Sequence, residues 1–209
     1  MLRCLLLALA TSLALAGAAR ADDTARGGAP TMKVLRYAFP AAETGFDPAQ
    51  VTDLYSNTVL ANILEAPLEY EYLAQPARVR VNTAAAMPEV SPDYTHFVFR
   101  IRPAIFFADD AAFKGQRREL TAADFVYAIK RHYDPRWKSG NLYILENAKI
   151  LGLGELRKQA IDGKKPFDYD APIEGLQAID RYTVQYTTQT PRPRLLEALA
   201  TGDLFGAVA

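Results

Sequence analysis

Residues 95–102 read THFVFRIR, and residues 120–131, one loop later, read LTAADFVYAIKR. In the first stretch, Phe97, Phe99 and Ile101 alternate with neighbours that are mostly charged. Successive side chains of a β-strand point to opposite faces, so this pattern predicts a strand with one apolar face and one solvated face. The next residue is a proline, which ends the strand. This strand and the segment after it decide the fold class.

The second stretch predicts a helix that is capped by Thr121. The Thr121 hydroxyl can accept a hydrogen bond from the amide of Asp124, whose carboxylate can reach back to the start of the helix, as in a capping box. Phe125, Val126 and Ile129 give the helix an apolar stripe. The helix is expected to end at the aspartate that precedes a proline, because the residue before proline disfavours the helical conformation.

The other segments mix strand and helix patterns without strict alternation. The predicted strands are residues 33–39, 68–73 and 182–188. The predicted helices are residues 52–64, 148–163 and 191–200, of which the second is broken at Gly152 and Gly154. Residues 109–118 are expected to form a polar loop, and no repeat of 20–50 residues is visible. The sequence therefore predicts an α/β fold of the mixed α+β kind, with residues 33–209 as its folded part.

The composition is that of a folded globular protein. Of the 209 residues, 50% are hydrophobic and 23% are charged, and 24 basic residues balance 24 acidic ones. Binding to nucleic acid requires a basic face, and a net charge of zero does not indicate one. Cys4 is the single cysteine, so the sequence excludes a disulfide bond within this chain.

The first 21 residues have the pattern of a secretory signal peptide. Arg3 precedes an apolar run at residues 5–16, and Ala19-Arg20-Ala21 supplies the small residues of a cleavage site. The apolar run is too short to span a bilayer, and a buried N-terminal helix is the alternative. Cleavage after Ala21 predicts export, most simply to a bacterial periplasm. Residues 22–32 would then form a disordered lead-in.

Few residues have a spacing that is typical of catalysis. His96 and His132 have no Cys, His or Glu at metal-ligand spacing, so we expect neither a metal site nor a cofactor. We expect His96 on a strand face and His132 beside the carbonyls at the end of its helix. Gly152-Leu153-Gly154 is only half of a dinucleotide-binding fingerprint. No nucleophile-elbow motif or catalytic residue is identified, so binding is favoured, and a secreted hydrolase is the alternative.

Several segments in a fixed order resemble a known family. They are GFDPA at residues 45–49, AMPEVSPDYTHFVFRIR at 86–102, LTAADFVYAIKR at 120–131, IEGLQAID at 173–180 and YTV at 182–184. This series is similar to the N-terminal part of family 5 of the bacterial extracellular solute-binding proteins, the oligopeptide- and dipeptide-binding group. The stretch that combines a turn, an alternating strand and a capped helix is the most specific part of the resemblance.

The resemblance implies one lobe of a type II periplasmic binding protein. Such a protein is a monomer that captures a peptide-like solute between two lobes, closes about a hinge and delivers the solute to an ABC permease in the inner membrane. It has no cofactor and is not an enzyme. The family's ligand-lining positions correspond here to Thr52, Asp53, Leu54, Tyr55, Asn141 and Tyr143.

The chain departs from the family pattern in two places. The family usually has a short Asp-Gly turn between the strand and the capped helix, whereas here Asp109-Asp110 precedes a longer loop at residues 111–119. Family members are also much longer, and their second lobe carries an acidic residue that receives the amino group of the ligand. We therefore expect the second lobe to be missing from this chain, and a truncated, non-transporting fragment is a further alternative.

Overall fold

The computed structural model describes residues 33–209, so the predicted signal peptide and lead-in lie outside the described residues. The chain divides into two units, residues 1–38 and residues 39–209. Residues 33–38 of the first unit are exposed, and the strand predicted at residues 33–39 is wrong, because no strand is found there. An alternating pattern is not sufficient for a strand, since its backbone groups also need a neighbouring strand as hydrogen-bond partner.

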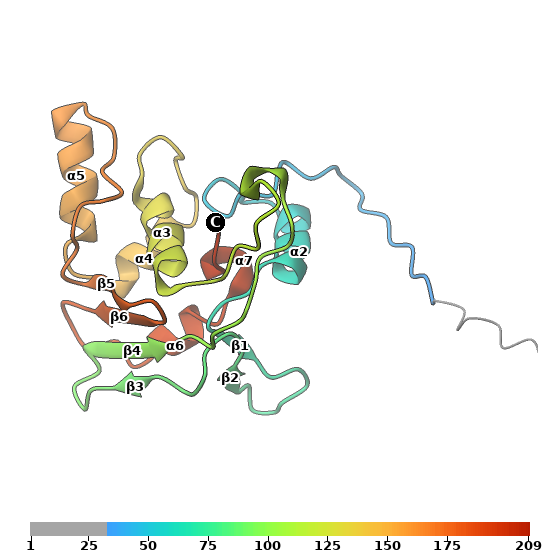
Figure 1. Ribbon diagram of the computed structural model, residues 1–209, viewed down its shortest axis with the longest axis horizontal. Coiled ribbons are helices and arrows are strands. Elements are labelled where there is room, and N and C mark those ends of the chain that lie inside the picture. Colours follow the sequence, from blue (N-terminus) through green and yellow to red (C-terminus); the bar gives the residue numbers. More distant parts are fainter. Residues whose placement is uncertain (1–32) are drawn as a thin grey trace, which may run out of the picture. The chain divides into compact units, whose positions relative to one another are not determined.

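A four-stranded antiparallel sheet forms one layer of the second unit, with α3 (Ala122–Tyr133) and α5 (Leu153–Gly163) on one side of it (Figure 1). Its strands, in spatial order, are β3 (Glu89–Val90), β4 (His96–Arg100), β6 (Thr183–Thr187) and β5 (Leu176–Asp180). The two inner strands confirm the strands predicted at residues 95–102 and 182–188. Their register places Phe97 opposite Tyr186 and Phe99 opposite Val184, so the buried side chains of both strands share one face.

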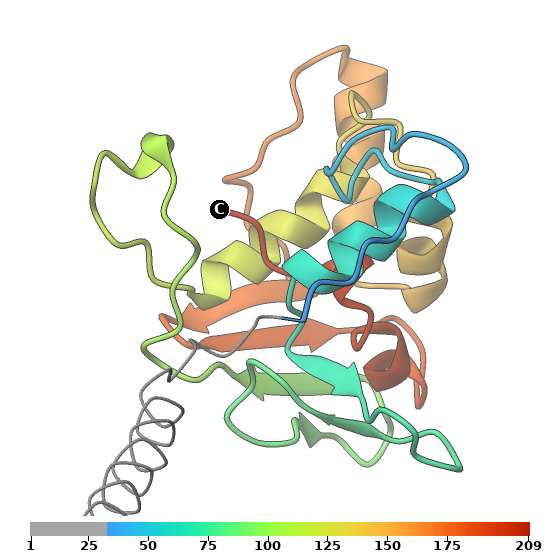
Figure 2. The same cartoon turned by 90° about the vertical axis from the view of Figure 1, so that its right-hand side faces the viewer.

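A separate two-stranded sheet and six helices complete the unit. The small sheet pairs β1 (Leu68–Tyr70) with β2 (Val79–Val81), so the strand predicted at 68–73 is confirmed in shorter form. The helices are α2 (Leu54–Ile63), α3 (Ala122–Tyr133), α4 (Leu142–Ala148), α5 (Leu153–Gly163), α6 (Leu195–Ala198) and α7 (Gly202–Phe205). Figure 2 shows α2 and α3 on the same side of the larger sheet. The predicted mixed α/β class is confirmed.

Helix α3 begins and ends as its sequence predicts. The Asp124 carboxylate accepts hydrogen bonds from the backbone amide of Thr121, at 2.7 Å, and from its hydroxyl, at 2.9 Å. Arg118 donates to the same carboxylate, so this buried charge is compensated. The helix ends at Tyr133, and the predicted stop at Asp134 is therefore confirmed. Helix α3 packs against strands β5 and β6 of the sheet.

Glycine breaks the predicted helix 148–163 at one position rather than two. Helix α4 ends at Ala148, and α5 begins at Leu153, directly after Gly152. Gly152 has a φ of 86°, a left-handed conformation that costs glycine little and other residues more. The break predicted at Gly154 is wrong, because this residue lies in the first turn of α5.

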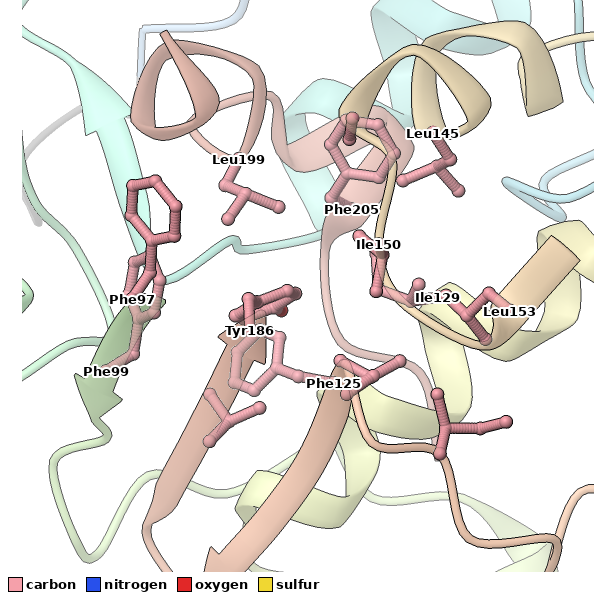
Figure 3. Packing of buried hydrophobic residues seen from close by; sticks show 14 of the residues in the cluster. Phe97, Phe99, Phe125, Ile129, Leu145, Ile150, Leu153, Tyr186, Leu199 and Phe205 are labelled. Atoms are coloured by element: carbon pink, nitrogen blue, oxygen red, sulfur yellow. The ribbon is translucent and has the colours of Figure 1, made fainter. Parts of the chain in front are cut away.

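The hydrophobic core joins the sheet to α3. Phe97 and Phe99 of β4 and Tyr186 of β6 are at most 1% exposed, as are Phe125 and Ile129 of α3 (Figure 3). The rings of Phe99 and Tyr186 meet edge to face with centroids 5.5 Å apart. This packing fixes the position of α3, and the last residues of α3 in turn hold the loops described next.

Candidate ligand-binding site

The Phe-Asp-Pro segment forms a tight turn that is fixed to α3 by an ion pair. The main-chain oxygen of Asp47 accepts hydrogen bonds from the amides of Gln50 and Val51, at 2.9 and 3.0 Å. Both carboxylate oxygens of Asp47 accept from Arg131, at 2.9 Å from Nη1 and 2.6 Å from Nη2. The side chains of Asp47 and Arg131 are only 27% and 15% exposed. A bidentate, partly buried pair of this kind sets the orientation of the turn.

The residue after Arg131 fixes a second loop. His132 is buried, its Nδ1 lies 2.8 Å from the Ser139 hydroxyl, and its Nε2 lies 2.9 Å from the main-chain oxygen of Leu204. A carbonyl can only accept, so Nε2 donates, and the neutral ring accepts from Ser139 at Nδ1. Burial lowers the pKa of His132 and favours this neutral form. The expected contact with the end of its own helix is wrong, because the carbonyl belongs to α7.

The two loops contact each other directly. Asn141 donates a hydrogen bond from Nδ2 to the main-chain oxygen of Val51, at 3.1 Å. Gly140 lies so close to Thr52 that a Cβ atom at position 140 would overlap the Thr52 methyl group. We call residues 47–53 and 139–141 the loop pair. Arg131 therefore anchors the loop at residues 47–53, and His132, the next residue of α3, anchors the loop at residues 139–141. The two loops also contact each other through Val51 and Asn141.

The structure assigns supporting contacts to two of the residues predicted to bind ligand. Asp53 caps α2: its Oδ1 accepts from the amide of Ser56 at 2.8 Å, and the Thr44 hydroxyl donates to its Oδ2. The hydrogen bonds from Ser56 and Thr44 hold the pKa of Asp53 well below its usual value, so the carboxylate is charged. The ring of Tyr55 packs against Phe39 with centroids 5.2 Å apart.

The other predicted residues fall into two places. Thr52, within the loop pair, and Leu54, directly after it, are exposed, and 71% of the surface of Leu54 is accessible. Asn141 belongs to the loop pair itself. Tyr143, on α4, lines a different hollow, formed with residues 191–198. The structure thus brings five of the six predicted residues together around the start of α2 and places Tyr143 at the margin.

Sequence reasoning missed the residues that hold the loops. Asp47 lies in a quoted motif, but its partner Arg131 is 84 positions away, and no local spacing connects them. Ser139 and His132 are separated by a turn whose path the sequence does not specify. Among residues 33–209, no group of three or more His, Cys, Asp or Glu side chains could hold a metal ion. Within the same range no helix is long and apolar enough to cross a membrane.

The fold defines the class of protein. OppA of Haemophilus influenzae, solved in complex with RPPGFSPFR, matches this structure with a TM-score of 0.63 and 24% sequence identity. The match covers 81% of this chain and 29% of that chain. At this identity the likeness shows the fold alone, and the fold is part of a periplasmic-type binding protein.

The sequence comparisons identify the family. The model of the bacterial extracellular solute-binding proteins, family 5 Middle, matches residues 78–203, and the chain belongs to this family. It is 33% identical to the oligopeptide-binding protein AmiA of Streptococcus pneumoniae over 106 residues, 50% of this chain and 14% of AmiA. It is 28% identical to di/tripeptide-binding protein 4 of Pseudomonas aeruginosa over 208 residues, 96% of this chain. The chain spans about a third of that relative's length, 32%.

Proposed function

We propose that this chain supplies the solute-binding part of an ABC importer in a bacterial periplasm. Membership of family 5 supports binding rather than catalysis. The names of two relatives, one an oligopeptide-binding protein and one a di/tripeptide-binding protein, support a peptide or peptide-like solute. The protein acts as a monomer without a cofactor and passes its solute to a permease in the inner membrane.

The proposed ligand site is the loop pair together with the first turn of α2. Thr52 and Leu54 are the direct contacts, because both residues are exposed and neither side chain forms a hydrogen bond or an ion pair within residues 33–209. Asp53 holds the start of α2 through hydrogen bonds from Ser56 and Thr44, and Asn141 joins the two loops through the hydrogen bond from its Nδ2. Tyr55 orients the first turn of α2 through its contact with the ring of Phe39.

Tyr143 is proposed as an outer contact of the same site. The support for it is its exposure and its position two residues after Asn141, at the start of α4. In this proposal the solute lies between this lobe and a second lobe, and hinge closure covers it.

One observation carries the proposed site: the hydrogen bond from Asn141 to the main-chain oxygen of Val51. This bond joins segments that are 90 residues apart in the sequence, and each segment contains residues that the family resemblance predicts to bind ligand. The contact between the two segments supports one shared site. A surface built from two loops that are each anchored to a buried helix is rigid enough to select a ligand.

The test compares two apolar residues at opposite ends of α2. Leu54 and Ile63 are 71% and 59% exposed, and each is changed to serine in the full chain. Di-, tri- and tetrapeptides are titrated while the fluorescence of Trp137 and the melting temperature are followed. Leu54→Ser should weaken binding of the tightest peptide about tenfold, equal to about 1.4 kcal/mol, and Ile63→Ser less than about twofold. Mass spectrometry should recover the peptide intact.

Three results would contradict the proposal. They are the absence of peptide binding, an equal loss of affinity in both variants, and cleavage of the peptide, which would favour the hydrolase. The proposed export is tested separately by the intact mass of protein recovered from a bacterial periplasm. We expect a chain that begins at Asp22, with residues 1–21 removed, and a mass that retains them would exclude cleavage after Ala21.

A further inference from the structure

A hollow of about 400 Å³ lies between α4 and the segment that leads into α6. Its wall is mostly apolar. The apolar residues that line it are Ile144, Ala148, Pro191, Pro193, Leu195 and Ala198. The two prolines have fixed φ angles, so one side of the hollow is formed before any ligand arrives. The volume is within the range of small-molecule sites, which is roughly 300–1,000 Å³.

Arg192 brings a positive charge to this hollow. Its backbone amide is fixed, because it donates to the main-chain oxygen of Tyr94 at 2.8 Å. Its side chain has no ion pair or hydrogen bond within residues 33–209, and its Nε is buried without an acceptor. The nearby Arg194 differs, because it pairs with Glu197 at 2.6 Å. The guanidinium of Arg192 therefore has no anionic partner of its own within the described residues, and an anion in the hollow would supply one.

We infer that this hollow binds a carboxylate carried by a compact apolar group, such as the C-terminal residue of a peptide. The flat guanidinium of Arg192 can donate two parallel hydrogen bonds to a carboxylate, while the apolar wall covers the attached side chain. The exposed ring of Tyr143 closes the rim and offers a further hydroxyl.

This hollow shares only Tyr143, at its rim, with the proposed ligand site. None of Thr52, Asp53, Leu54, Tyr55 and Asn141 belongs to its lining. It would therefore bind its ligand in a chain whose loop pair had been altered. The two sites can be tested independently of one another.

The experiment uses two probes that differ only in charge. N-acetyl-L-leucine has the carboxylate, and N-acetyl-L-leucinamide is its neutral counterpart. Binding to the full chain is measured by NMR titration. We expect the acid to bind at least tenfold more tightly than the amide, with shifts confined to residues around α4 and α6. Arg192→Gln should weaken binding of the acid at least tenfold and remove its preference over the amide.

Two further variants complete the test. Ala198→Leu should fill the hollow and abolish binding of the acid while the melting temperature stays within about 3 °C. Arg100→Gln is the matched control, because Arg100 forms an exposed ion pair with Glu89 on the sheet, and it should bind the acid as the original chain does. If Ala198→Leu unfolds the protein, Ala198→Met takes its place.

Several outcomes would overturn the inference. They are equal affinity for acid and amide, unchanged affinity in Arg192→Gln, retained binding in a folded variant at position 198, and no binding of the acid at 10 mM. Leu54→Ser should leave binding of the acid unchanged. A loss of acid binding in that variant would show that the probe occupies the loop pair instead.

Discussion

At the scale of single residues, the ion pair of Asp47 and Arg131 is the strongest contact of the candidate site. Both partners are partly buried, and the two hydrogen bonds are 2.9 and 2.6 Å long. Asp47→Asn keeps the shape of the side chain and leaves Arg131 without its counter-charge. We expect the free energy of unfolding to fall by about 2 kcal/mol, because the remaining charge is incompletely solvated.

Urea unfolding at pH 7 measures this change. The control is Glu89→Gln, which breaks an exposed ion pair with Arg100 and should cost less than about 1 kcal/mol. An equal fall in the free energy of unfolding in the two variants would mean that the partly buried ion pair of Asp47 stabilises the protein no more than an exposed ion pair does.

His132 makes the stability depend on pH. Burial lowers the pKa of His132 in the folded protein, while Asp47 raises it and Arg131 lowers it. In the unfolded chain its pKa is near the ordinary value of about 6.5. Below that pH the unfolded state binds a proton that the folded state does not, so stability falls as the pH drops from 7.5 through 6.5. Stability is fully present above the unfolded pKa and is lost towards the lower folded pKa.

Urea titrations between pH 7.5 and 5.5 test this dependence. His132→Gln should flatten the slope, because glutamine can donate to the carbonyl of Leu204 but does not titrate. The matched comparison is His96→Gln, which replaces the other histidine, an exposed residue of β4. Parallel slopes for the original protein and His132→Gln would exclude His132 as the source.

Local signals predicted single residues well, and distant partners could not be predicted. Thr121 and Asp124 are three positions apart, and their capping contact follows from helix geometry. Asp53 also has a local role, because its oxygens cap α2, and the ligand contact that the family resemblance implies for it stays a prediction. The contact between Asp47 and Arg131 depends on how α3 packs against the sheet, and no local sequence pattern predicts that packing.

At the scale of elements, the close approach of Gly140 to Thr52 joins the segments that precede α2 and α4. A methyl group at position 140 would overlap the Thr52 methyl group. We expect Gly140→Ala to separate the loops, lower the free energy of unfolding by about 1–3 kcal/mol and weaken peptide binding. The double variant with Thr52→Ala should recover stability, because it removes the overlapping methyl group.

The double-mutant cycle is measured by thermal and urea unfolding. The control is Gly154→Ala, since a Cβ at that position would meet no atom within 4 Å and the residue lies in α5. Additive losses at positions 140 and 52 would show that the two loops do not contact each other as described.

Elements whose sequence carries several agreeing signals were predicted most accurately. Strand β4 has a strict alternation and a terminal proline, and α3 has a cap, a stripe and a stop. Residues 33–39 have only the alternation and form no strand. The helix predicted at 191–200 is reduced to α6, because two prolines leave little room for helical hydrogen bonds before Leu195.

At the scale of the whole molecule, one core supports both the sheet and the candidate site. Phe97 is fully buried on β4, on the same face as Phe99 and opposite Tyr186 of β6. Phe97→Ala should lower the free energy of unfolding by about 3–5 kcal/mol, because it leaves a large cavity in the core. Since α3 anchors both loops, peptide binding should also weaken in the variant at temperatures where it is still folded.

Chemical denaturation and peptide titration measure the two effects. Val98→Ala, on the other face of the same strand, should cost less than about 1.5 kcal/mol and leave peptide affinity unchanged. A large loss of stability in Phe97→Ala without any loss of affinity would show that the loop pair does not depend on the core.

The position of Arg131 and His132 next to each other also constrains how such a chain can change in length. Successive residues of a helix are separated by about 100° around its axis. Inserting or deleting one residue in α3 before Arg131 would turn both anchors away from Asp47 and Ser139 at once. Residues 109–118 contain only a short 3₁₀ turn, so an inserted or deleted residue there would not rotate a helix relative to its partners. Related sequences are therefore expected to vary in length in that loop and to keep the length of α3 constant.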